Sequence, residues 1–151
     1  MRASIEDARE LIAEGDRLMG QGCERAQPPK GAATDLDLAL AEDCFERAAQ
    51  AYLVGAVEYQ ESQRGAEHPR FASDEPDELI QRLDGHLGVE AGAALQAARR
   101  LPKNSAQASV YQAQAFAENV RDRFAHALPE LFNRPADAGV ERSDSRPNWS
   151  R

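Results

Sequence analysis

Hydrophobic positions along most of the chain recur every three or four residues, which is the spacing of an α-helix. The first such stretch begins at Ser4, and two glycines, Gly20 and Gly22, are expected to end it. The dipeptide Pro28-Pro29 follows and is typical of a connecting loop. The beginning of the chain therefore predicts one helix and then a loop.

The second periodic stretch has the broadest apolar face and runs from Asp35 to about Ser62. Thr34 or Asp35 is expected to cap its first turn, because short polar side chains accept hydrogen bonds from free backbone N–H groups. One row of apolar positions recurs every three or four residues, and a second row lies beside it: Leu38, Ala41, Phe45, Ala48, Tyr52, Ala56 and Tyr59, then Leu40, Cys44, Ala51 and Val54. A stripe this wide predicts a helix that is contacted from more than one side, near the middle of a bundle.

A proline and two glycines divide the next part of the chain. Pro76 suits the first turn of a short helix that is expected to end near Asp84. Gly85 and Gly88 interrupt the pattern, and helical spacing then resumes as far as Leu101. These residues predict either two helices or one kinked helix.

The last strong helix is expected to begin near Ser105 and to end near Leu128. No stretch alternates for long enough to indicate a strand. The prediction is an all-α fold, a four- to five-helix antiparallel up-down bundle. Residues 1–133 would form this domain, and the polar residues 134–151, with the isolated Trp149, are expected to form a flexible tail.

The formal charge of −8 mainly excludes some classes of function. An acidic chain does not coat nucleic acid over a broad surface, because phosphate binding needs concentrated Lys and Arg, although a small basic cluster is still compatible with it. The first residues lack the apolar run of a signal peptide, and no stretch has the length of a membrane span. We expect a cytoplasmic protein that makes no contact with a membrane.

The residues that commonly bind metals do not occur at metal-ligand spacings. Cys23 lies in the expected loop and Cys44 on an apolar helical stripe, and their spacing is not that of a zinc site. A disulfide between them is the less favoured alternative. No Glu-x-x-His pair is present, and His68 and His86 are expected to face solvent. The sequence predicts no metal and no cofactor.

One short motif lies near the end of the last predicted helix. Residues 121–126 read Arg-Asp-Arg-Phe-Ala-His, and this segment resembles the signature of the HEPN superfamily. That signature has an arginine, a polar residue, and a histidine after four to six intervening positions. The segment is also similar to the Arg-Asn-x-Phe-Ala-His of mannitol-operon-repressor-like members. Leu128 stands where many toxin-type members have a tyrosine, which argues against toxin-type activity.

The resemblance implies metal-independent cleavage of RNA by a homodimer. Such chemistry needs a base for the 2′-hydroxyl proton and a cation for the charge that develops on the phosphate. His126 would be the base, Arg121 the cation, and Asp122 would hold the imidazole from four residues away. Residues five apart on a helix point about 140° from each other, so two motifs facing across a symmetric dimer would have to form the site.

A simpler interpretation explains the same residues without catalysis. Arg121, Arg123 and His126 lie near a helix C-terminus, where the helix dipole favours positive charge in any protein. Asp122 and His126 would then be an ordinary surface pair. The second hypothesis is a non-catalytic module that binds another protein or dimerises, indicated by the wide apolar stripes, the acidic surface and Trp149 in the tail.

Overall fold

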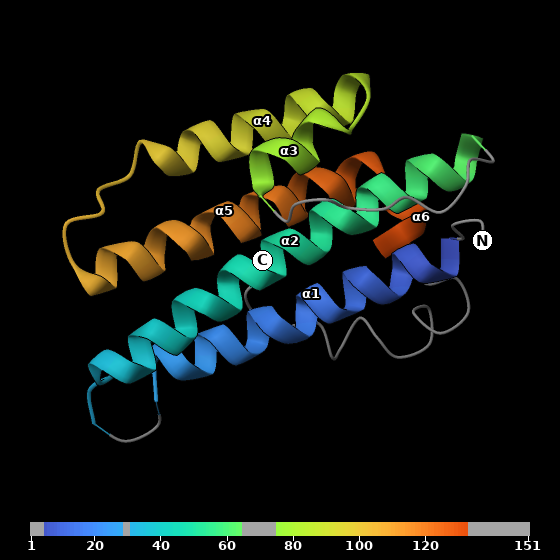
Figure 1. The fold of residues 1–151 in the computed structure, drawn as a ribbon. Coiled ribbons are helices and arrows are strands. Elements are labelled where there is room, and N and C mark those ends of the chain that lie inside the picture. Colours follow the sequence, from blue (N-terminus) through green and yellow to red (C-terminus); the bar gives the residue numbers. More distant parts are fainter. Residues whose placement is uncertain (1–4, 29–30, 65–74, 133–151) are drawn as a thin grey trace.

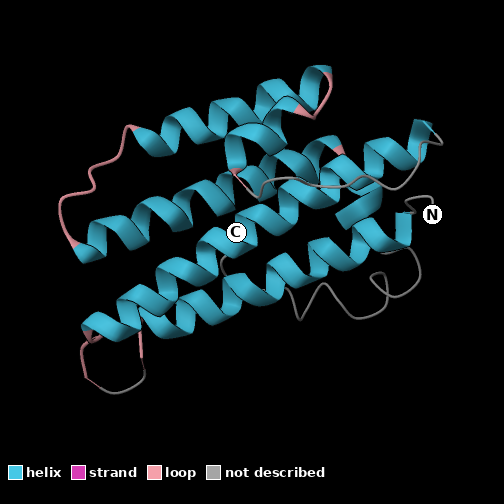
Figure 2. Ribbon diagram, viewed as in Figure 1, coloured by secondary structure: helices cyan, strands magenta, loops and turns pink. Residues whose placement is uncertain are grey.

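The computed structural model describes residues 5–28, 31–64 and 75–132. Within these ranges all regular structure is helical and no strand occurs (Figure 2). The elements in chain order are α1 (Ile5–Ala26), α2 (Asp35–Arg64), α3 (Pro76–Gln81), α4 (Gly85–Arg99), α5 (Ala106–Ala127) and α6 (Pro129–Phe132). The predicted all-α fold is confirmed. The predicted tail with Trp149 lies outside the described residues, and so does Ser4, the expected start of the first helix.

The four long helices α1, α2, α4 and α5 pack antiparallel to their neighbours (Figure 1). They lie in the spatial order α1, α2, α5, α4, so α2 packs against α1 on one side and α5 on another, with the short α3 near its C-terminal half. The predicted central position of this helix is confirmed. In contrast, α4 packs mainly on α5 and hardly touches α2. Among the residues that the structure describes, the bundle is therefore open between α2 and α4.

The first helix is longer than its glycines predicted. It continues through Gly20 and Gly22 to Ala26, which places Cys23 in the helix and not in a loop. A glycine in a helix costs about 1 kcal/mol relative to alanine, and tertiary packing often outweighs that preference. Gly22 is buried against α2, so the prediction that the helix ends there was wrong.

Two glycines of α1 give space to two aromatic rings of α2. A Cβ atom on Gly15 would lie 2.5 Å from Cε1 of Tyr52, and one on Gly22 would lie 2.7 Å from Cε1 of Phe45. Both separations are far below van der Waals contact. The glycines are seven residues apart and so are the rings, so both contacts belong to one antiparallel register. The rings fill hollows that only glycine provides, and this brings the two helices close together.

Side-chain caps fix the beginnings of α2 and α5. The Thr34 hydroxyl accepts a hydrogen bond from the Asp37 N–H at 3.1 Å, and the Asp37 carboxylate accepts one from the Thr34 N–H at 3.0 Å. These two hydrogen bonds form a reciprocal capping box. The sequence left Thr34 and Asp35 open as the cap, and the structure has Thr34. The Ser105 hydroxyl accepts from the Ala108 N–H at 3.0 Å and caps α5, which begins where the sequence predicted.

The glycines after α3 separate two helices and do not kink a single one. Gly85 has a φ of +52°, a conformation that suits glycine, and α4 begins at this residue. A Cβ atom on Gly88 would lie 2.9 Å from the carbonyl oxygen of Leu83, so the second glycine lets the new helix turn back close to the old one. Of the two alternatives that the sequence left open, the structure has two helices.

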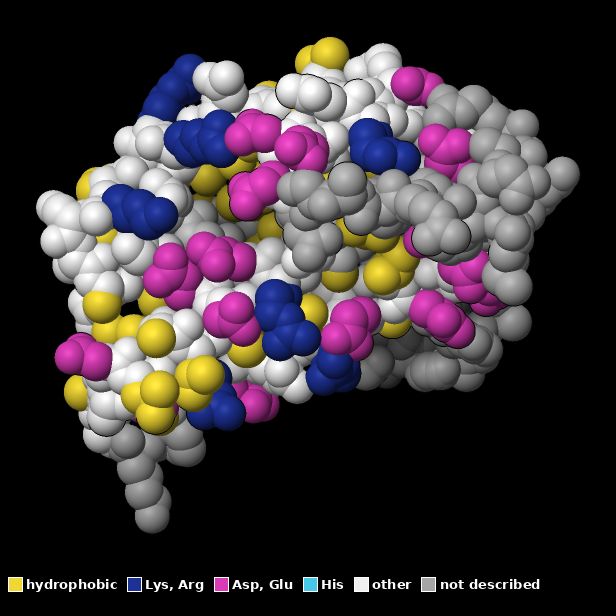
Figure 3. Space-filling model, viewed as in Figure 1, with side chains coloured by type: hydrophobic (Ala, Val, Ile, Leu, Met, Phe, Trp, Pro, Cys, Tyr) yellow, Lys and Arg dark blue, Asp and Glu magenta, His cyan; other side chains and the backbone are white. Residues whose placement is uncertain are grey.

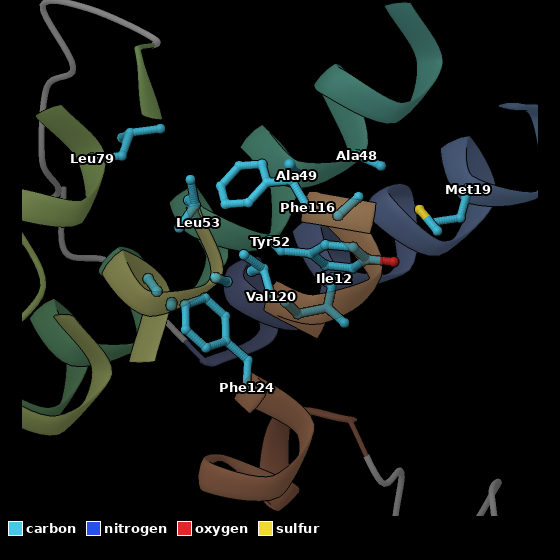
Figure 4. Packing of buried hydrophobic residues seen from close by; sticks show 14 of the residues in the cluster. Ile12, Met19, Ala48, Ala49, Tyr52, Leu53, Leu79, Phe116, Val120 and Phe124 are labelled. Carbon is cyan, nitrogen blue, oxygen red and sulfur yellow. The ribbon is translucent and has the colours of Figure 1, made fainter. Parts of the chain in front are cut away.

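The core lies where α1, α2 and α5 meet and extends towards α3 and α4 (Figure 4). Small residues of α2 alternate with large ones, so that Ala48 and Ala49 lie beside Tyr52 and Leu53. Each of these four side chains is almost completely buried. The core residues that the other helices contribute include Ile12, Met19, Leu79, Phe116, Val120 and Phe124.

The chain turns back after α5, and α6 packs against α1 and α5. The long helix ends at Ala127, close to the predicted Leu128, and Pro129 begins the short one. The Tyr59 hydroxyl donates a hydrogen bond to the Glu130 carboxylate. The Arg9 guanidinium donates two hydrogen bonds to the Glu130 carbonyl oxygen, at 3.1 Å and 3.0 Å. These contacts hold the end of the described chain on α1 and α2.

Candidate functional site

Arg121, the first residue of the sequence motif, points from α5 towards α1. Its Nε donates to Oδ1 of Asp16 at 2.6 Å, and its Nη2 donates to Oδ2 of the same carboxylate at 3.1 Å. The Tyr52 hydroxyl donates to Oδ1 of Asp16 at 2.5 Å. The guanidinium also lies over the Phe132 ring, 5.3 Å from its centre. Arg121 therefore joins α5, α1, α2 and the end of α6.

The burial of these groups strengthens the network. The Arg121 side chain is 18% exposed and the Asp16 side chain 35% exposed. Burial disfavours the charged guanidinium, but its hydrogen bonds and ion pair with Asp16 outweigh this effect and raise the pKa of Arg121. Burial, together with the charge of Asp16, raises the pKa of Tyr52 far above its ordinary value. Tyr52 therefore remains a neutral donor, and this arrangement stabilises the bundle.

The other two predicted catalytic residues lie on a different side of α5. Asp122 and His126 are exposed, and neither makes a hydrogen bond or ion pair within the part of the chain that the structure describes. The structure does not bring Arg121 together with His126 inside one chain, as their spacing predicted. Arg123, between them in the motif, donates to Glu90 on α4 at 2.5 Å.

The described residues place no cluster of metal-binding side chains beside the motif. Among the described residues, no three His, Cys, Asp or Glu side chains converge as a metal site. Cys23 and Cys44 are free thiols, and burial raises the pKa of Cys23, which makes it a poor nucleophile. His86 is exposed and lies 3.5 Å from Glu90, while His68 falls outside the described ranges.

Comparison with known proteins identifies no relative. No protein-family model, curated protein or solved structure matches the chain significantly. In the ranges that the structure describes, no helix is long and apolar enough to cross a membrane. Any function must therefore be inferred from the surface and chemistry of the chain itself.

A groove that the sequence did not predict lies between α2 and α4, with α5 beneath it. Its cavity volume is about 540 Å³, and it exists because α4 packs on α5 without closing onto α2. Figure 3 shows acidic and basic side chains along this space, with hydrophobic side chains visible between them. Its apolar lining residues, here called the floor, are Ala49, Leu95, Ala98, Ala113 and Phe116, and Gln50, Ser109 and Gln112 add polar groups beside them.

The walls of the groove carry charge of both signs, with the acidic side chains concentrated on α2. Glu42, Asp43 and Glu46 line this wall together with Arg47, which lies 3.7 Å from Asp43, and Arg99 and Lys103 lie on the side of α4. The two walls are asymmetric, because one presents three carboxylates within a little more than one helical turn. A ligand that fits this groove would combine apolar groups with positive charge facing α2.

Local contacts set the charge of the two walls. Reduced hydration between the walls raises the pKa of Glu46, and the negative charges of Glu42 and Asp43 raise it further. The smaller part of this rise, which comes from Glu42 and Asp43, reflects the negative charge on the α2 wall. On the other wall, Arg99 pairs with Asp77 at 2.8 Å, which neutralises part of its charge. The groove is therefore more negative than its lining residues alone suggest.

Proposed function

We propose that this chain is a non-catalytic helical module that binds a basic, partly apolar segment of another protein in the groove between α2 and α4. The single observation that carries this proposal is the open groove itself, with its apolar floor and its carboxylates on one wall. An amphipathic helix commonly binds by placing one apolar face in such a groove. The volume of about 540 Å³ suits the inward-facing side chains of such a helix, while its backbone lies above the rim.

Charge decides which kind of segment fits. The net charge of −8 opposes a second copy of this chain or another acidic partner. A segment with Lys or Arg beside its apolar face would meet Glu42 and Glu46 and would lower the repulsion between them. Burial is the main cause of the raised pKa of Glu46, and the negative charge of Glu42 adds to it. The occupant is therefore expected to be cationic as well as apolar.

The contacts of Arg121 also favour binding over catalysis. Its guanidinium makes two hydrogen bonds to Asp16 and lies over Phe132, so it is part of the internal packing. Breaking a buried ion pair to free one partner costs several kcal/mol, of order 3–5 for a fully buried pair. A catalytic role for Arg121 would require this rearrangement, whereas binding in the groove requires none.

The test measures binding of a synthetic amphipathic helix with leucine and alanine on one face and arginine beside it. Calorimetry should detect binding to the wild-type chain and not to a matched peptide with glutamate in place of arginine. Glu42→Lys/Glu46→Lys should weaken binding about tenfold or more, since two reversed charge contacts are worth roughly 1–2 kcal/mol. Glu10→Lys/Glu24→Lys, on exposed positions of α1, changes the net charge equally and is the control. If the control variant weakened binding as much as Glu42→Lys/Glu46→Lys, only net charge would matter, and binding in the groove would be refuted.

A second proposal rests on the resemblance to HEPN proteins, namely a homodimeric, metal-independent ribonuclease. The all-helical fold and the exposure of Asp122 and His126 on one side of α5 support it. In such a dimer His126 would take the proton of the 2′-hydroxyl, and Arg121 would exchange Asp16 for the phosphate. RNA incubated with the protein in EDTA tests this directly. Cleavage should be lost in His126→Ala, and cleavage equal in both proteins would exclude the assignment.

A further inference from the structure

We propose that the chain's own residues 142–151 occupy the groove between α2 and α4 when no partner is bound, with Trp149 on the apolar floor. This inference rests on the proposed function and adds its regulation. The segment would compete with a partner for the same carboxylates and the same floor. The partner would then have to displace it.

The composition of this segment matches the groove. Residues 142–151 contain Arg142, Arg146 and Arg151 but only one acid, Asp144. This excess of positive charge contrasts with the net −8 of the whole chain. Trp149 lies among these arginines and is the single tryptophan of the sequence. The segment therefore combines positive charge with a large apolar ring, which are the two properties that the groove calls for.

The size of the tryptophan side chain also fits the site. A tryptophan buries about 150–250 Å² when it packs, and a cavity of 300–1,000 Å³ is typical of sites that enclose a ligand. The groove, at about 540 Å³, has room for one indole ring and the stems of adjacent arginines. Ala98 and Ala113 in its floor have no side chain beyond Cβ, so they leave space for a flat ring.

The connecting chain is long enough. The groove lies over the N-terminal half of α5, near Gln112, and the described chain ends after α6 at Phe132. From Gln112 to Ala127 the helix rises about 22 Å, at 1.5 Å per residue. Residues 133–149 span up to roughly 55 Å when extended, at 3.3 Å per residue. Trp149 can therefore reach the groove, even by a path around the edge of α5.

Covalent attachment makes this competition effective. A segment joined to its site by a short linker acts at an effective concentration in the millimolar range. Weak binding of residues 142–151 is therefore enough to fill the groove most of the time. A partner segment with similar contacts would displace it only if it bound more tightly or at several points.

Tryptophan fluorescence of the full chain tests the inference, because every signal comes from Trp149. In the wild type we expect blue-shifted emission and quenching by acrylamide that is several-fold weaker than for a free tryptophan peptide. Glu42→Lys/Glu46→Lys should restore the emission and the quenching of the free peptide, and so should Ala113→Arg, which fills the floor. The control Glu10→Lys/Glu24→Lys should behave as the wild type. Circular dichroism of each variant verifies that it is folded.

Three results would overturn the inference. Wild-type Trp149 could be as accessible to acrylamide as the free peptide. Its protection could persist in both groove variants, which would put the ring elsewhere. Its protection could also increase with protein concentration, which would place the segment in the groove of another copy.

A second measurement separates this inference from the proposed function. Trp149→Ala should bind the synthetic arginine helix at least several-fold more tightly than the wild type, because the competitor is weakened. Unchanged affinity, with the groove variants still defective, would overturn the tail's role and leave the proposed function in place. No binding of the helix even to Trp149→Ala would remove the proposed function and this inference with it.

Discussion

Replacing Gly15 with alanine tests the close packing of α1 against α2. The new Cβ would lie 2.5 Å, 2.8 Å and 2.9 Å from three atoms of the Tyr52 ring. The ring has little freedom to move away, because it is fully buried and its hydroxyl is bonded to Asp16. Forcing extra atoms into a packed core costs about 1–3 kcal/mol. The higher helix propensity of alanine offsets about 1 kcal/mol of this cost, so the free energy of unfolding should fall by roughly 1 kcal/mol.

Gly20 in the same helix provides the matched control. A Cβ at this position meets nothing within 4 Å, so Gly20→Ala should gain up to about 1 kcal/mol from propensity alone. The two variants should therefore differ by about 2 kcal/mol in the free energy of unfolding. Urea denaturation followed by far-ultraviolet circular dichroism measures this difference. If Gly15→Ala proves as stable as Gly20→Ala, the close approach of the two helices is not as described.

Three further predictions concern the ionisable side chains. Glu46 has a raised pKa in the folded chain, so its carboxylate opposes folding at neutral pH. Glu46→Gln should therefore stabilise the protein at pH 7 by less than about 1 kcal/mol. Thermal melts at several pH values should show this gain disappearing below the ordinary pKa of 4.5, where the wild-type side chain is also neutral. Arg121→Ala and Asp16→Ala should each cost about 2 kcal/mol because the pair is only partly solvated, and the double variant should cost less than their sum in urea denaturation. His126→Ala, at an exposed position, should stay within about 0.5 kcal/mol of the wild type.

Most of the fold follows from periodicity, because each long helix has a clear apolar face. The end of α1 does not, since a glycine can stop a helix or give space to a neighbouring side chain. Gly20 and Gly22 look alike in the sequence, yet only Gly22 meets a ring of α2. That distinction depends on Phe45, which lies on another helix. Local patterns contain no such information, so the helix boundary was predicted wrongly.

The motif in residues 121–126 has a similar limit. Its spacing correctly implied that Arg121 and His126 face different directions. The partner of Arg121 is Asp16, 105 residues away on α1, and no local pattern links the two. The exposed or buried state of each motif residue depends on which helices neighbour α5. A sequence shows the faces of each helix but not which faces meet.

The groove could nevertheless have been anticipated from α2. From Ala51 to Tyr59 almost every position of this helix is buried, whereas Glu42, Asp43, Glu46 and Arg47 form a polar stripe nearer its beginning. Closing α4 onto that stripe would remove three carboxylates from water, and unpaired buried charges are very costly. The bundle therefore stays open at this place for an electrostatic reason, although the floor beneath is apolar. A segment that is both apolar and cationic covers the exposed apolar floor and neutralises the carboxylates of the α2 wall. The groove therefore favours such an occupant over a second acidic helix.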